Sequence, residues 1–192
     1  MKKITITLLS FIILIALTSC SARNIRGPVT HELLFPLGTY THNVHIKPIL
    51  ENGQEAKEFS FKGIVKIEKD TLRMSGLSPF GTTLFKFTED SQTGKVELVN
   101  YIEALKKFES KFLDYYAILK VLLRAPQDFS DKNALRLVSK SENGKPEKLE
   151  TVGLPKNASF VFKKYDKNGI PEEIQIIHPN FLIDIRVAGY EV

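Results

Sequence analysis

The sequence predicts an α+β fold, mainly β, in which a curved antiparallel sheet of about nine to eleven strands carries one long amphipathic helix. Three observations support this prediction. Many segments alternate apolar and polar residues, short turn sequences separate them, and one central segment changes to helical spacing. A sheet and a helix that each bury one face should pack together. Strong curvature would make the helix a lid or plug over an apolar cavity, although a filled core gives the same pattern.

The first strand with a clear pattern covers residues 59–68. Its odd positions are apolar or glycine, and its even positions are polar except for Ile64, which is typical of a half-buried strand. Turn sequences at 91–94, Asn143-Gly144 and 166–169 predict further antiparallel hairpins. The other segments with strand spacing begin at these apolar residues: Leu72, Phe85, Val96, Leu135, Phe160, Ile174 and Phe181.

The helical segment is expected over residues 101–124. Asn100 and Glu103 have the spacing of a capping box at its start, and Pro126 is placed to end it. Apolar residues recur there every three or four positions, which predicts one buried helix face. They are Leu105, Phe108, Phe112, Tyr115 or Tyr116, Leu119 and Leu122.

The N-terminal segment predicts export and lipid attachment. Lys2 and Lys3 precede a short apolar run, which is typical of a secretory signal and too short for an ordinary membrane span. Leu17-Thr18-Ser19-Cys20 resembles the lipobox at which bacterial lipoproteins are cleaved and lipidated. We therefore expect a cleaved signal over 1–19, a lipidated Cys20 with a tether over 20–34, and one domain over 35–192. An ordinary signal peptide that happens to contain a cysteine is the alternative.

Composition narrows the possible partners. The formal charge is +5 and falls to +3 when Lys2 and Lys3 are removed with the signal. The remaining positive charges are scattered, so no nucleic-acid partner is expected. We expect a monomer that reaches the membrane through Cys20. Ser21 follows that cysteine, where enteric bacteria use aspartate to retain lipoproteins in the inner membrane. This favours the periplasmic face of the outer membrane of a Gram-negative bacterium.

Signals of enzyme chemistry are weak. The segment from Gly76 to Gly81 resembles a nucleophile elbow, but its second glycine comes one residue late and it leads into a strand. His42 and His45 are three apart on an expected strand, so they should lie on opposite faces and cannot share a metal. We therefore expect no catalytic site, no metal and no cofactor.

The loop Leu77-Ser78-Pro79-Phe80-Gly81 is unusual because it carries two large apolar residues where a turn is normally polar. Pro79 and Gly81 restrict and release the backbone around Phe80. From the residues alone, Phe80 is either tucked under the sheet or exposed for a membrane or protein contact, and the tucked position is favoured.

Taken in order, the lipobox, the hairpins, this loop and the central helix resemble LolB, the outer-membrane lipoprotein family that receives other lipoproteins. The resemblance covers about residues 56–190, and the segment 72–83 matches the strand and loop in which that family has Pro-Leu-Gly. It implies an unclosed antiparallel β-barrel with a helical lid over an apolar cavity. It also implies an exposed Phe80 in the place of the family's leucine. The chain departs from the family in lacking tryptophan and in having one long helical segment.

The resemblance implies that the cavity takes acyl chains of lipoproteins or other lipids. It further implies that a LolA-like periplasmic carrier supplies them and that the loop helps to place them in the outer membrane. A scaffolding lipoprotein with a filled barrel and a protein partner is the alternative. The candidate residues for membrane contact and cargo release are Leu77, Pro79, Phe80 and Gly81. The candidate residues for the acyl cavity are Phe61, Val65, Phe85, Phe87, Phe108, Phe112, Tyr116 and Leu119.

Overall fold

The computed structural model describes residues 33–49, 57–90, 92–106, 109–125, 134–153 and 157–192. The chain divides into two compact units, Met1–Thr30 and His31–Val192, and every described residue belongs to the second. Cys20 and the expected signal peptide therefore lie outside the described residues. In the described part, no helix is both long and apolar enough to cross a membrane.

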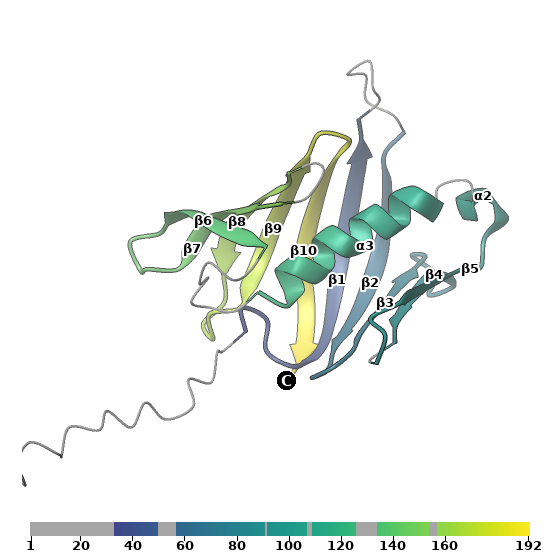
Figure 1. Ribbon diagram of the computed structural model, residues 1–192, viewed down its shortest axis with the longest axis horizontal. Coiled ribbons are helices and arrows are strands. Elements are labelled where there is room, and N and C mark those ends of the chain that lie inside the picture. Colours follow the sequence, from purple (N-terminus) through teal and green to yellow (C-terminus); the bar gives the residue numbers. More distant parts are fainter. Residues whose placement is uncertain (1–32, 50–56, 91, 107–108, 126–133, 154–156) are drawn as a thin grey trace, which may run out of the picture. The chain divides into compact units, whose positions relative to one another are not determined.

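The second unit is built on one antiparallel sheet of ten strands, in the order β5-β4-β3-β2-β1-β10-β9-β8-β7-β6 (Figure 1). Over the described residues, the end strands β5 and β6 do not pair with each other, so the sheet is unclosed, as predicted. The strands are β1 (Gly38–Pro48), β2 (Phe59–Ile67), β3 (Leu72–Leu77), β4 (Thr83–Glu89), β5 (Val96–Asn100), β6 (Leu135–Lys140), β7 (Pro146–Thr151), β8 (Ser159–Tyr165), β9 (Pro171–His178) and β10 (Phe181–Glu191).

The alternation in the sequence matches the burial of the strands. In β2, Gly63, Val65 and Ile67 are buried, while Ser60, Lys62 and Lys66 are exposed. The register then carries this inner face across the sheet, because Val44 of β1 pairs with Phe61 on one side and Ile185 on the other. The predicted turns at 141–145 and 166–170 are also present, and Gly144 and Gly169 adopt the left-handed conformation that these turns need.

The described helical residues, within the expected range 101–124, are α2 (Glu103–Lys106) and α3 (Glu109–Leu123), and residues 107–108 between them lie outside the described residues. Figure 1 shows α3 lying across one face of the sheet, in front of β10, β1 and β2. Phe112, Tyr116 and Leu122 are buried against that face, as the spacing predicted. Lys111 and Asp114 are exposed on the opposite side.

The predicted capping box at the start of the helix was wrong. Asn100 is the last residue of β5 and pairs with Phe85 of β4, so its backbone belongs to the sheet. Its side-chain Oδ1 is buried and has no hydrogen-bond partner among the described residues. Pairing with β4 thus overrode the local signal for a helix start, which the four-residue α2 replaces at Glu103.

Candidate functional site

A small apolar cavity of about 60 Å³ lies between α3 and the inner face of the sheet. Its walls come from β1, β2, β3, β4, β9, β10 and α3. Seven of the eight side chains predicted for an acyl cavity line it, and the eighth, Phe108, lies outside the described residues. The seven are Phe61, Val65, Phe85, Phe87, Phe112, Tyr116 and Leu119.

Aromatic rings fill most of the space between helix and sheet. The Phe112 ring of α3 lies 5.0 Å from the Phe85 ring of β4, measured between centroids, and Tyr116 lies 5.0 Å from Phe87. Phe85 also meets Phe61 of β2 edge to face at 5.2 Å. Such ring pairs stabilise a packed interface beyond the area they bury. Phe85 in turn occupies the space above Gly76, where an added Cβ would come within 2.3 Å of the ring.

The size of the cavity decides what it can hold in this conformation. An apolar cavity of about 150 Å³ is known to hold benzene, and about 60 Å³ is less than half of that. An acyl chain is far larger than benzene. Binding of such a chain therefore requires α3 to move away from the sheet, while the closed conformation is a nearly filled core.

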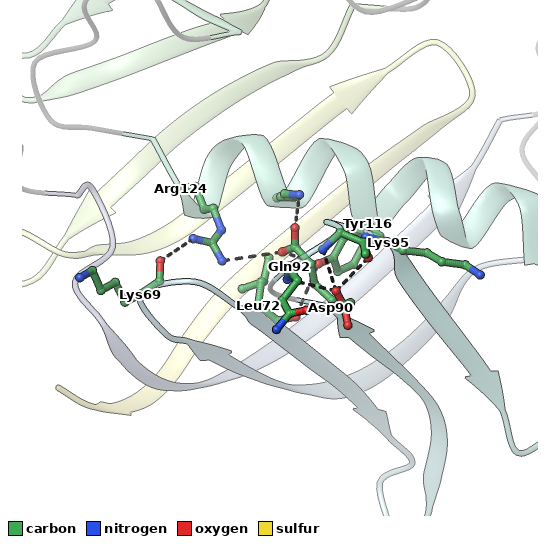
Figure 2. Close-up of polar contacts among 10 residues, drawn as sticks. Lys69, Leu72, Asp90, Gln92, Lys95, Tyr116 and Arg124 are labelled. Carbon is green, nitrogen blue, oxygen red and sulfur yellow. Dashed lines mark hydrogen bonds and ion pairs between the residues drawn. The ribbon is translucent and has the colours of Figure 1, made fainter.

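A buried carboxylate fastens the C-terminal part of α3 to the sheet. The side chain of Glu89, at the end of β4, is 6% exposed and forms an ion pair with Lys120 of α3. The Tyr116 hydroxyl lies 3.3 Å from Glu89 Oε2, and Arg124 Nη2 lies 3.7 Å from the same oxygen. Arg124 also donates to the carbonyl of Lys69 at 3.1 Å. Figure 2 shows Arg124 extending from the helix, with a dashed line to the carbonyl of Lys69.

The same environment affects Tyr116. Burial, followed by the nearby charge of Glu89, raises the pKa of the Tyr116 hydroxyl well above its usual value. The hydroxyl therefore stays protonated and acts as a hydrogen-bond donor to Glu89. Together these contacts hold one end of the helix in place over the cavity.

This ion-pair cluster was not predicted from the sequence, although two signals for it exist. Glu89 continues the alternation of Phe85 and Phe87, so it had to face inward with them. Lys120 and Arg124 are four residues apart, which places them on one side of the helix. The sequence therefore indicated that Glu89 faces inward and that Lys120 and Arg124 share one side of the helix. It did not show that these side chains contact one another, because that depends on how the helix packs on the sheet.

The loop between β3 and β4 presents Phe80 to solvent. Phe80 is 95% exposed, which agrees with the position implied by the LolB resemblance and not with the tucked alternative. The Ser78 hydroxyl accepts hydrogen bonds from the backbone amides of Phe80 and Thr82 at 3.3 and 3.1 Å. Gly81 has a φ of 83°, which allows the chain to turn back into β4. The loop is thus held by its own hydrogen bonds while the ring projects outward.

The rest of the predicted loop is less apolar at its surface than its sequence implied. Leu77 is half-buried at the end of β3, and Pro79 and Gly81 are exposed beside Phe80. The role of the four residues in membrane contact stays a prediction.

A larger hollow, of about 720 Å³, lies on the outer face of the sheet and is open to solvent. Charged side chains line it and pair with one another: Lys163 lies 3.5 Å from Asp184, and Arg186 lies 3.2 Å from Glu173. Its lining mixes these charged pairs with apolar residues such as Leu77 and Pro79, whereas the lining of the smaller cavity is almost entirely apolar and suits a hydrocarbon chain better. Volume alone is therefore a poor guide here, and the apolar cavity is the better candidate for lipid.

His42 and His45 lie on opposite faces of β1, as their spacing predicted. His42 is 5% exposed and lines the apolar cavity, whereas His45 faces outward and contacts Ser60 and Glu58. Burial lowers the pKa of His42 to about 4, so its imidazole is neutral at neutral pH. Within the described ranges, no three histidine, cysteine, aspartate or glutamate side chains are grouped so that they could hold a metal.

Comparison with known proteins finds similar folds among solved structures. No family model matches the chain, and no curated protein matches it. Among solved structures, the chain is similar to a domain from Vibrio parahaemolyticus that is described as an outer membrane lipoprotein-sorting protein. The match has a TM-score of 0.41 and 10% sequence identity, and it covers 80% of this chain and 85% of that chain.

Proposed function

We propose that this protein is a membrane-anchored lipoprotein that binds an acyl chain under α3 and delivers it to the outer membrane, acting by transfer and without covalent chemistry. The observation that carries the proposal is the exposed Phe80 ring at the tip of a loop whose backbone is fixed. A ring that is 95% exposed gains most from entering a lipid surface. Cys20 would supply the permanent anchor, and the loop would make the second contact with the same membrane.

The cavity supports the binding half of the proposal. Its lining is almost entirely apolar, and burial of hydrocarbon is favourable by about 0.8 kcal/mol for each CH₂ group. An acyl chain needs no specific polar contact to bind there once α3 has moved. Because the cavity measures only about 60 Å³ with α3 packed on the sheet, return of the helix to this position would help to expel the chain into the membrane. The carrier that supplies the cargo would be a soluble periplasmic protein of the LolA type.

The small size of the cavity also favours a second candidate function. A scaffolding lipoprotein needs only a filled core and a surface for a protein partner, and the closed packing of α3 on the sheet provides such a core. In that case Phe80 would contact the partner protein instead of lipid. The two functions differ in whether the domain takes up an acyl chain at all.

Transfer of a fluorescent fatty acid to phospholipid vesicles tests the proposal. The chain without residues 1–19 and with Cys20→Ser should take up the probe and release it to vesicles. Phe80→Glu should slow release by roughly tenfold or more, because burial of a phenylalanine side chain in lipid is worth about 1.5–3 kcal/mol. Val138→Glu, at an equally apolar but less exposed position on β6, is the control and should transfer normally.

Normal transfer by Phe80→Glu would remove the loop from the mechanism. Failure of the unsubstituted protein to take up the probe would reject the acyl-binding function and favour the scaffold.

A further inference from the structure

The cavity wall contains one polar group whose presence the proposed function does not explain. His42 faces inward from β1, among the apolar residues of the cavity, and is 5% exposed. Its Nε2 is buried and has no hydrogen-bond partner among the described residues. A buried polar atom normally has a partner, so an unpaired one aimed into a cavity points to a partner on a ligand.

Neither a neighbouring side chain nor a water explains this nitrogen. The Tyr116 hydroxyl lines the same cavity but is directed to Glu89 and to the Leu72 carbonyl. A buried water needs two to four polar partners, and the lining of this cavity is almost entirely apolar. The imidazole thus has a hydrogen-bonding capacity that the protein itself leaves unused.

Two features of the backbone set His42 apart from its neighbours in β1. On one side, His42 pairs with Gly63 of β2, which has no side chain to fill the inner face. On the other side, the register with β10 shifts between Thr41 and His42, so that Ala188 is an extra residue in β10. Such bulges redirect side chains and are frequent beside functional sites. A glycine and a bulge therefore flank the one histidine in the cavity wall.

We propose that His42 Nε2 donates a hydrogen bond to the carbonyl oxygen of an acyl ester, so that the cavity selects ester-linked acyl chains over plain hydrocarbon. This inference rests on the proposed acyl-binding function and adds the class of cargo to it. A neutral imidazole carries one N–H donor, and an ester carbonyl is an acceptor without charge, so neither partner brings a charge into an apolar site. Acyl esters occur both in lipoproteins and in membrane phospholipids.

Displacement of a bound fluorescent fatty acid tests this selection. The competitors are methyl laurate and the n-alkane with the same number of heavy atoms. Three proteins are compared: the parent, which lacks residues 1–19 and carries Cys20→Ser, and two variants of it, His42→Leu and His42→Gln. We expect the ester-to-alkane affinity ratio to fall by roughly 5- to 10-fold in His42→Leu, the factor that one neutral hydrogen bond provides. His42→Gln should restore part of it, because its amide N–H reaches a position similar to that of Nε2.

A spectroscopic measurement separates a ligand contact from a structural role. The ¹⁵N resonance of His42 Nε2 in the parent protein, assigned among the four histidines by its loss in His42→Gln, should move when methyl laurate is added and stay in place with the alkane. The shift itself is measured on the parent protein, and the folded one of His42→Gln and His42→Leu supplies the assignment. A diacylglyceryl lipopeptide and a phosphatidylethanolamine of equal chain length, used as further competitors, distinguish the two sources of ester.

The outcomes are distinct. An unchanged ratio in His42→Leu, together with an unmoved Nε2 resonance, would overturn the role of His42 and leave acyl binding intact. If the parent protein binds neither competitor nor the probe, the proposed function fails, and the inference fails with it.

Discussion

Two histidines on β1, three residues apart, show how differently the two faces of the sheet treat a polar side chain. On the outer face, the ring nitrogens of His45 lie 2.7 Å from the Ser60 hydroxyl and 2.8 Å from a Glu58 oxygen. Lys47 pairs with the same Glu58 at 3.1 Å. On the inner face, His42 is buried, and its Nε2 has no hydrogen-bond partner in the described part of the chain.

This difference identifies the face on which function should be sought. Outer-face polar groups meet water or mobile charged neighbours, so their interactions contribute little and can be replaced. A polar group on the inner face is costly unless something satisfies it. Glu89 is satisfied by Lys120, Arg124 and Tyr116, and we assign it to holding the helix. His42 Nε2 has no hydrogen-bond partner in the parts of the chain that the structure describes, and we assign it to the ligand.

The largest expected effect is on the free energy of unfolding, when a carboxylate on the inner face (Glu89) and one on the outer face (Glu58) are each replaced by a neutral amide. Glu89→Gln should lower the free energy of unfolding by about 2–4 kcal/mol, because it leaves Lys120 and Arg124 without a counter-charge at a partly buried site. Glu58→Gln on the outer face, where water replaces the lost contacts, should have a much smaller effect. Urea unfolding of both variants checks the contrast. Equal losses would show that Glu89 is not a structural latch.

A smaller effect is expected from pH. Burial lowers the pKa of His42 from its usual 6.5 to about 4. Between these two pH values, the His42 imidazole is therefore protonated in the unfolded state and neutral in the folded state. The free energy of unfolding should therefore fall as pH falls through that window, by about 2 kcal/mol between pH 7 and pH 5. Urea unfolding at both pH values should show that His42→Gln removes this part of the pH dependence.

Asn43→Ala, at the next position on the outer face, carries no titratable group and is the control for that experiment. It should keep the pH dependence of the parent protein. A His42→Gln variant that loses as much stability on acidification as the parent would contradict the burial of a neutral imidazole.

The smallest effect concerns the space beside His42. A Cβ added at Gly63 would lie 3.5 Å from Val44 Cγ2 and 3.6 Å from His42 Cβ, which are ordinary contact distances. Gly63→Ala should therefore raise the free energy of unfolding by about 0.5 kcal/mol, through a less flexible unfolded chain. It should also weaken binding of the fatty-acid probe, because it fills part of the cavity. Thermal unfolding measures the change in stability, and titration with the probe measures the change in binding. Ser60→Ala on the outer face is the control and should leave probe binding unchanged.

The fold followed closely from local patterns. Alternation in 59–67 identified both a strand and its buried face, and the spacing of Phe112, Leu119 and Leu122 identified the helix face. These predictions succeeded because the side-chain periods of strands and helices are fixed by the backbone. The capping box at Asn100 failed because a local signal competed with sheet pairing to Phe85, which links positions distant in sequence.

The site was only half predictable for the same reason. Apolar side chains on known faces had to meet under the helix, so seven of the predicted residues line this cavity, while their contact with an acyl chain stays a prediction. The sequence could not supply the partners of Glu89, which come from α3, or the place of His42 beside Gly63 and a bulge. Nor did the residues alone decide whether Phe80 was tucked or exposed.

The sequence by itself determined the strand faces, the helix stripe and the apolar character of what lies between them, because these depend on the order of residues within each element. Its prediction of lipid attachment at Cys20 stands as a prediction. Only the tertiary structure decided that the cavity has a volume of about 60 Å³, that Glu89 fastens α3, and that His42 Nε2 has no hydrogen-bond partner among the described residues. Each of these depends on distances between residues far apart in the chain, and packing sets those distances.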